Sequence, residues 1–437
     1  MPSPFLITNE RQEREVGLLI GQITNALSSE EILKSVVEGL PPEVIEGVRC
    51  SLATERQELA ESLKAYQNAQ HGTADELTAR AGNDPGSLLV AARVAKGWKQ
   101  KELARRLFLP EQQVQRYEAE RYRSISLGNL IRVARTLGVR LAVDISNPLQ
   151  EPWLPSHEMT LAELQKVLKH ARSHGWLDKA DQSDEAGINQ LRRTVAEHVG
   201  EYGTPSLLRT GLNVTDYSDD WLLLAWKAQV TRIAIKFSQR NRVKYRLLNV
   251  SWLKDLVQLS AFDDGPVRAV ALLAQHGIVL VAEPQIVGMK IDGAAFLVDD
   301  IPVIGLTLRT DATDNFWFTL LHEVAHIILH YRTGLASGFF DDVDNQDIDE
   351  LEAEANQFAS SMLIPDELWK RSPARIAKTA EPIEQLARRL GIAPAIVFGR
   401  VRMERKNYKI FSDKIGRGRV RKQLLSRSFE ADHEPSA

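Results

Sequence analysis

Two histidines four residues apart, with a glutamate directly after the first, set the strongest constraint on the fold of this chain. Residues 322–326 read His-Glu-Val-Ala-His, and apolar residues around them recur at helical spacing. On a helix, positions i and i+4 lie on one face, so His322 and His326 can reach one metal ion while Glu323 projects beside them. The segment therefore predicts a helix with a zinc site that keeps a position open for water, next to a carboxylate that takes the proton of that water. Thr313 and Asp314 are the N-cap candidates for this helix.

A catalytic zinc ion needs a third protein ligand, and a second amphipathic segment supplies candidates. Residues 349–363 carry glutamates at positions 350, 352 and 354 beside an apolar stripe. Glu352 and Glu354 border this stripe on opposite flanks, while Glu350 lies further towards solvent. Helical periodicity alone does not choose between Glu352 and Glu354.

The segment from Phe318 to His330, followed by Glu354-Ala-Asn-Gln-Phe-Ala and Leu363-Ile-Pro, resembles the ImmA/IrrE family of bacterial metallopeptidases. The resemblance covers roughly residues 205–412. It implies an α+β zincin-like domain and a zinc endopeptidase. In that family the glutamate before Ala-Asn is the third ligand, so the resemblance implies that His322, His326 and Glu354 bind Zn²⁺ and that Glu323 is the general base. Glu352 is the alternative ligand.

Segments that begin at Gly277, Gly293 and Ile301 read as β-strands. In zinc peptidases an edge strand beside the active-site helix commonly binds the substrate backbone, which predicts an extended peptide as substrate. His330, one turn beyond His326, is either a substrate-binding residue or a histidine satisfied at the helix end, and Tyr331 is a candidate oxyanion donor.

The acidic segment 339–349 between the two ligand helices has the composition of a calcium loop. It lacks the glycine and the terminal glutamate at EF-hand spacing, so it is interpreted as a solvated loop.

A second region, residues 87–145, reads as a series of short helices with a tight turn between two of them. From Ser87 to Arg140 there are twelve Lys and Arg against four Glu, a balance of 12 − 4 = +8, in a chain whose net charge is −3. A basic helical module attracts DNA phosphates with salt-dependent affinity. The region is therefore predicted to bind double-stranded DNA.

With Gln100, Leu103-Ala104, Val114, Glu118 and Leu137-Gly138 in the family's places, this region resembles the XRE (phage-repressor-like) helix-turn-helix family. It departs from the family at Phe108, where a glycine is usual in the turn. Pro110 is expected to start the recognition helix. The candidate DNA contacts are Gln112, Gln113 and Arg116 at base edges, and Lys99 and Gln100 at phosphates.

The chain is expected to be multi-domain and mainly α-helical, with the small sheet confined to the peptidase domain. The predicted domains are a helical N-terminal region at 1–86, a helix-turn-helix domain at 87–145, a linker and helical connector at 146–204, the peptidase domain at 205–412 and a basic, then acidic, tail at 413–437. The N-terminal region either pairs protomers into a homodimer, as repressors on two-fold sites do, or forms a solvent-exposed arm.

Composition limits the other possibilities. One cysteine excludes an internal disulfide, and neither a secretory signal nor an 18-residue apolar run is present, so a cytoplasmic protein without a membrane partner is expected. The sequence as a whole predicts a DNA-binding regulator with zinc-dependent endopeptidase activity on a regulatory protein: a repressor, a toxin partner or another copy of this chain. The alternative is an antitoxin-like transcription factor whose zincin-like domain senses or sequesters a partner without catalysis.

Overall fold

The computed structural model divides the chain into two compact units, residues 1–33 with 49–150 and residues 34–48 with 151–437. Each unit is described by itself. The structure describes residues 6–82, 84–122, 125–140, 160–177, 183–202, 207–210, 221–241, 244–298, 301–331, 335 and 345–430. The first part of the predicted linker and connector, residues 146–159, and most of the acidic segment 339–349 lie outside these residues, and the predicted domain boundaries stay predictions.

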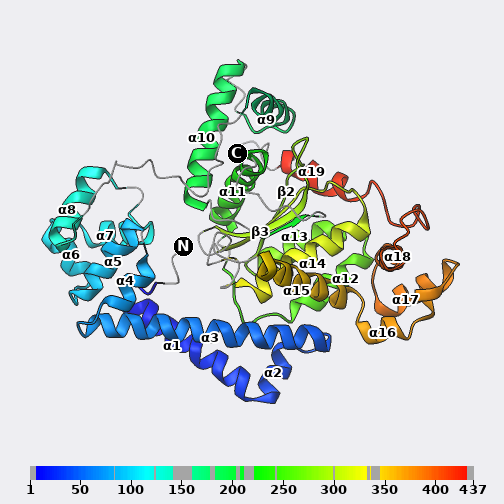
Figure 1. Ribbon diagram of the computed structural model, residues 1–437, viewed down its shortest axis with the longest axis horizontal. Helices are drawn as coiled ribbons and strands as arrows, with labels where there is room; N and C mark the ends of the chain where they lie inside the picture. The colour runs from blue at the N-terminus through cyan, green and yellow to red at the C-terminus, as the bar shows by residue number, and fades with distance from the viewer. Residues whose placement is uncertain are drawn as a thin grey trace, which may run out of the picture. The chain divides into compact units, whose positions relative to one another are not determined.

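The first unit consists of helices in the part that the structure describes (Figure 1). Several helices begin where a polar side chain accepts a hydrogen bond from the first backbone N–H groups: Asn9, Asp84 and Ser126 do so for α1, α5 and α8. Two further helices, α2 (Glu30–Val36) and α3 (Pro42–Gln70), cross the division between the units. The others are α1 (Glu10–Ser28), α4 (Asp75–Ala81), α5 (Pro85–Ala95), α6 (Gln100–Leu107), α7 (Glu111–Ala119) and α8 (Leu127–Leu137).

The expected helix-turn-helix is formed by α6 and α7. Pro110 is the N-cap of α7, so the prediction that it starts this helix is confirmed. Phe108 ends α6 in the left-handed region, with φ 55°, where its N–H and that of Leu109 close onto the carbonyls of Arg105 and Ala104. Glycine is usual at this position because it has no Cβ to clash. The aromatic side chain of Phe108 is 89% exposed, so it makes little packing that could offset the backbone strain.

A buried ion pair ties the helices of this unit together. The Arg93 guanidinium donates to both carboxylate oxygens of Glu118, at 2.5 and 2.8 Å, and also to the backbone carbonyls of Trp98 and Thr8. A buried charge pair is stable only when its remaining hydrogen-bonding groups are satisfied, as these are. Arg93 thereby links α5 and α7 to the turn before α6 and to the residues that precede α1.

The second unit surrounds a four-stranded sheet with helices (Figure 1). Its strands are β1 (Leu207–Thr210), β2 (Val279–Ala282), β3 (Ile291–Val298) and β4 (Ile301–Leu306). Its helices are α9 (Leu161–Ser173), α10 (Asp184–Tyr202), α11 (Trp221–Asn241), α12 (Trp252–Gln258), α13 (Gly265–Gln275), α14 (Thr313–Leu329), α15 (Asn345–Leu363), α16 (Asp366–Lys370), α17 (Glu381–Leu390), α18 (Pro394–Glu404) and α19 (Val420–Glu430), with short 3₁₀ turns at Leu259–Ala261 and Pro373–Ile376. The three strands and the two ligand helices that the sequence predicts are therefore present.

The sheet has the strand order β1-β3-β4-β2. β3 runs antiparallel to both β1 and β4, whereas β2 and β4 are parallel. Ala294 pairs with Gly305, and a Cβ added to Gly305 would meet Trp226 of α11 at 2.6 Å. Since successive residues of a strand face opposite sides, Gly293 faces the other side, towards α14. The sheet is therefore covered by α11 on one face and by α14 on the other, as expected for an α+β domain.

The start of α14 differs from the expectation. Ala312 is the N-cap residue, without a side-chain hydrogen bond, and Thr313 and Asp314 already belong to the helix. Thr313 donates its hydroxyl to the carbonyl of Gly416, and Asp314 faces Arg402 at 3.6 Å. Tertiary contacts with α18 and with the residues after it therefore use the side chains that the sequence suggested as caps.

None of the helices in the described ranges is both long enough and apolar enough to cross a membrane.

Replacing Phe108 with glycine is expected to stabilise the first unit by about 0.5–1 kcal/mol, because the left-handed φ no longer strains a side chain. Thermal unfolding followed by calorimetry measures this. The control is Leu127→Gly, which removes another exposed apolar side chain of this unit from an ordinary helical conformation and should destabilise it by up to about 1 kcal/mol. Equal destabilisation by both substitutions would contradict the assignment of strain to Phe108.

Candidate functional site

The helix α14 carries the His-Glu-Val-Ala-His segment through the interior of the second unit. It packs against β3, α15 and α18. His322, Glu323 and His326 each have a fractional exposure of 0%. Polar side chains that are this deeply buried need strong partners, because removing them from water without partners costs several kcal/mol.

The two histidines meet a carboxylate from α15. Nε2 of His322 and Nε2 of His326 lie 3.0 Å apart. Glu352 places Oε2 3.2 Å from the first nitrogen and Oε1 3.4 Å from the second. One donor atom from each of these three residues lies within 4.8 Å of the others, a grouping suited to a metal ion.

Glu354, the third ligand that the family resemblance implies, has a different partner. Its Oε2 lies 2.8 Å from Nε2 of His330. Two residues apart on a helix means a rotation of about 200°, so Glu352 and Glu354 leave α15 on nearly opposite sides. The structure therefore places Glu352, the alternative, at the histidine pair and does not bring Glu354 to it.

His330 connects Glu354 to the histidine pair, since its Nδ1 lies 3.1 Å from Nδ1 of His326. An ionised carboxylate only accepts hydrogen bonds, so His330 donates to Glu354 from Nε2 and, as a neutral ring, accepts at Nδ1. His326 then donates from Nδ1 and keeps a lone pair on Nε2, the atom that faces His322 and Glu352. Glu354 and His330 thus favour the His326 tautomer whose Nε2 is available to a metal ion.

The protonation states of His326 and Glu352 also suit metal binding. Burial lowers the pKa of His326 to about 4, although the hydrogen bond to Glu352 acts in the opposite direction, so the ring is neutral at pH 7. Burial also opposes ionisation of Glu352, but the two histidines outweigh it and hold the pKa of Glu352 well below its usual range. Neutral imidazoles and an ionised carboxylate are the forms in which these side chains bind metal ions.

The donor set fits zinc in both chemistry and spacing. Two imidazoles and one carboxylate form a catalytic zinc site in several peptidases. Tetrahedral ligands at about 2.0–2.1 Å from the ion lie about 3.3 Å from one another. The two histidine nitrogens are 3.0 Å apart, and they lie 3.2 and 3.4 Å from the two different oxygens of Glu352, which is close to that distance.

Glu323 lies against the sheet. A Cβ added to Gly293 of β3 would be 2.7 Å from Oε1 of Glu323 and 3.0 Å from Thr319, so only glycine lets the strand pass this close to the carboxylate. A glycine within a strand can mark such a close approach, which is the signal that sequence reasoning did not use here. Tyr331, the candidate oxyanion donor, is buried and packs against Tyr245, with ring centroids 5.3 Å apart.

The predicted DNA contacts divide into exposed and internal groups. Gln112 and Arg116 are exposed one turn apart on α7. Gln113 is half-buried, and its amide nitrogen has no hydrogen-bond partner among the described residues. Gln100 donates to Glu118 at 2.8 Å, and Lys99 pairs with Glu10 at 2.7 Å on the surface. Gln112 and Arg116 are therefore better placed for base edges than Gln113.

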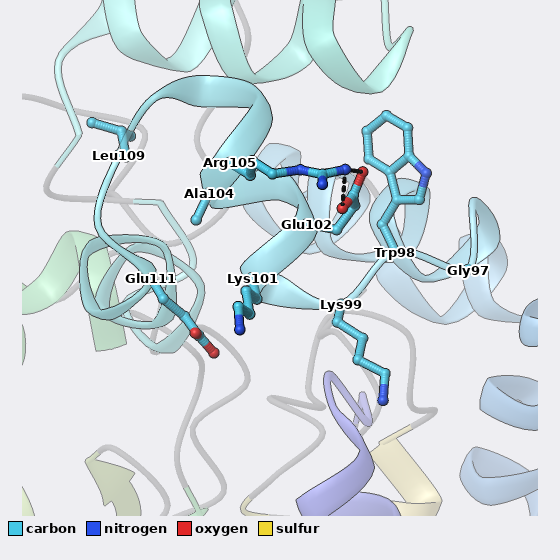
Figure 2. Close-up of a pocket in the computed structure, with 9 residues that line it drawn as sticks. All are labelled: Gly97, Trp98, Lys99, Lys101, Glu102, Ala104, Arg105, Leu109 and Glu111. Atoms are coloured by element: carbon cyan, nitrogen blue, oxygen red, sulfur yellow. Dashed lines mark hydrogen bonds and ion pairs between the residues drawn. The ribbon is translucent and has the colours of Figure 1, made fainter.

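Helical spacing adds Gln115 to this face. Gln115 is exposed and lies three residues after Gln112. A groove of about 700 Å³ runs beside α6 and reaches Glu111 at the start of α7. Figure 2 shows the amino groups of Lys99 and Lys101 extending to the same side as the Glu111 carboxylate, while Arg105 pairs with Glu102 at 2.8 Å.

Comparison with known families agrees with both halves of this description. Residues 273–400 match the Peptidase M78 family model, described as an IrrE N-terminal-like domain, and residues 89–143 match a helix-turn-helix family model. This chain joins a helix-turn-helix domain to an IrrE-like peptidase domain. Neither the curated proteins nor the solved structures gave a match.

The IrrE-like match begins in α13 and ends in α18, so it takes in β2, β3, β4 and both helices that carry the metal-binding side chains. Strand β1 and helices α9 to α12 precede it, and α19 follows it. The predicted resemblance to the two families is confirmed, and these outer elements lie outside the matched residues.

Proposed function

We propose that this protein is a DNA-binding regulator whose IrrE-like domain is a zinc-dependent endopeptidase. The observation that carries the proposal is the convergence of Glu352 from α15 with His322 and His326 within 4.8 Å, where the two histidines lie on the same buried helix as Glu323. A structural metal site has no use for a carboxylate in this place, whereas hydrolysis needs one.

His322, His326 and Glu352 would hold the ion, and a bound zinc ion supplies Lewis-acid polarisation of a carbonyl and acidifies water. Glu323 would accept a proton from the attacking water on a carboxylate oxygen and deliver it to the nitrogen of the leaving amine. His330 and Glu354 would hold the His326 ring in its orientation through hydrogen bonds, without contacting the substrate. Burial of the site excludes bulk water from these groups.

An extended segment of a protein is the substrate that the sheet favours. β3 runs beside Glu323 at Gly293 and is an inner strand, because β1 pairs antiparallel with it, with Arg209 opposite Gly293. An extended substrate backbone would therefore take the place of β1 on β3. A repressor, a toxin or related regulator, or another copy of this chain are the candidate substrates.

For the helix-turn-helix domain we propose sequence-specific binding to double-stranded DNA through α7, as a homodimer in the cytoplasm. Exposed Gln112 and Arg116 support base contacts, because glutamine suits adenine and arginine suits guanine in the major groove. The basic balance of this region supplies phosphate attraction.

One observation favours the second candidate, a transcription factor that senses or sequesters a partner without catalysis. His322, Glu323 and His326 are all closed off from solvent. A site that admits no substrate would act only as a metal-stabilised scaffold, so turnover has to be measured directly.

Zinc content separates the two candidate ligands. The wild-type chain is expected to bind near-stoichiometric zinc, and Glu352→Ala is expected to lose it, because one of the three converging donors is removed. Glu354→Ala should still bind zinc but with about 10–100-fold weaker affinity, because His330 loses its hydrogen-bond partner. Elemental mass spectrometry and competition with a chelator measure both. Zinc lost with Glu354 alone would contradict the assignment of Glu352.

Catalysis is tested with Glu323→Gln, which keeps the shape of the side chain but removes its basicity. New protein N-termini in cells that express the wild-type chain should disappear with this variant, while zinc stays bound. The matched control is Glu350→Gln at an exposed position of α15, which should leave the N-termini in place. Cleavage by Glu323→Gln at the wild-type rate would reject the endopeptidase and leave the sensor.

DNA recognition is tested on a sequence enriched from randomised duplexes by the wild-type protein. Arg116→Ala is expected to weaken binding to that sequence by about 1–3 kcal/mol and to relax preference at one base position, because base contacts carry specificity. Fluorescence anisotropy over a salt series measures this, with Arg240→Ala outside the domain as the control. Unchanged specificity after loss of Gln112 and Arg116 together would show that α7 does not read the bases.

A further inference from the structure

A second cavity, of about 500 Å³, lies in the same unit as the metal centre but shares none of its residues. Part of its wall follows the parallel strands directly: Gln285 and Val287 come after β2, and Thr307 comes after β4. In open α/β sheets, ligands bind outside the carboxyl ends of parallel strands, and β2 and β4 are the parallel pair of this sheet. The volume lies in the range of small-molecule sites.

Two helices that lie outside the IrrE-like match close this cavity. Lys166, Lys169 and His170 come from α9, and Arg421 comes from α19. α9 is fixed to the strand ends by Trp176, which donates from Nε1 to Oε1 of Glu283 at 3.0 Å. Arg421 is held in place by the backbone carbonyls of Leu308 and Arg309. The cavity therefore lies between strand ends inside the IrrE-like match and two helices outside it.

The lining has a positive character. Lys166, Lys169 and Arg421 contribute three cations, and no Asp or Glu is among the lining residues. The nearby carboxylate of Glu283 is engaged by Trp176. Val287 and Leu425 provide apolar surface next to these cations. Such a lining suits a small molecule with an anionic group on a partly apolar body.

Two buried polar atoms in the wall have no hydrogen-bond partner within the described ranges: Nε2 of His170 and Oε1 of Gln285. His170 is 7% exposed, and the nearest carboxylate oxygen, on Glu283, is 3.8 Å away. Both residues line the cavity, and buried polar atoms are almost always hydrogen-bonded, so a ligand with its own polar groups that reaches these side chains would supply the missing partners. The amide oxygen of Gln285 calls for a donor on that ligand.

We propose that this cavity binds a small organic anion, with its phosphate or carboxylate group at Lys166, Lys169 and Arg421 and a hydrogen-bond donor at Gln285. The proposal does not rest on proteolysis, because the cavity and the metal centre have no residue in common. It gives the chain a site for a metabolite signal between α9, α19 and the strand ends of the IrrE-like domain.

Binding is measured by calorimetry on the full chain with paired probes. Adenosine 5′-monophosphate stands beside adenosine, and 4-aminobenzoate beside 4-aminobenzamide, within a panel of small phosphates and carboxylates that each have a neutral counterpart. Binding of the phosphates alone, or of the carboxylates alone, supports the proposal and identifies the anionic group. A flat response to every anion, or equal binding of the neutral counterparts, overturns it.

Variants decide whether the anion occupies this cavity. The double variant Lys166→Met with Lys169→Met should lower the affinity for the anion by about 10-fold or more, as expected for lost charge-assisted hydrogen bonds. The matched control is Lys378→Met with Lys414→Met, two exposed lysines that do not line the cavity. Equal affinity in both double variants would place the anion elsewhere and overturn the proposal.

Gln285→Leu gives a readout that a purely structural residue would not give. Removal of an unsatisfied buried oxygen should leave the thermal stability of the free protein unchanged or raise it. The same substitution should weaken binding of the anion, because the hydrogen-bond donor of the ligand loses its acceptor on Gln285. A variant that is destabilised without ligand and binds the anion as tightly as wild type would show that Gln285 serves the fold and would reject its part in the site.

Discussion

The burial of α14 is the constraint on which the second unit depends. A helix with three fully buried ionisable side chains, His322, Glu323 and His326, is stable only if its neighbours supply partners. β3 has a glycine, Gly293, where the Glu323 carboxylate approaches the strand, and α15 places two glutamates beside different histidines. The residues at these positions of the sheet and of α15 therefore have to fit both the packing around α14 and the charges that it carries.

The first unit also contains buried charged side chains that depend on partners from neighbouring elements. Arg93 and Glu118 form a buried pair whose remaining hydrogen-bonding groups are used by backbone carbonyls and by Gln100. Loss of one partner from such a pair typically costs about 3–5 kcal/mol, because the other charge stays buried. Orientation of α7 in the helix-turn-helix domain thus depends on charges that do not contact solvent.

Sequence reasoning recovered what local spacing determines. The i, i+4 histidines, the three strands, the Pro110 helix start and the exposed Gln112 and Arg116 all follow from periodicity and propensity. The choice between Glu352 and Glu354 did not, because it depends on how α15 is rotated against α14, and both glutamates border the apolar stripe. Gln113 and Gln100 turned inward for the same kind of reason: tertiary packing decides which side of a short helix faces water.

The strand β1 has a consequence for selectivity in the proposed peptidase. An incoming strand on the edge of β3 would use the backbone groups that already pair with residues 207–210. Since every ladder hydrogen bond gained replaces one of the same kind, the backbone exchange is nearly neutral in free energy. Discrimination between proteins would then fall to the difference between the side chains that leave and those that arrive. A domain of this type would recognise amino-acid sequence more strictly than one whose sheet edge is open.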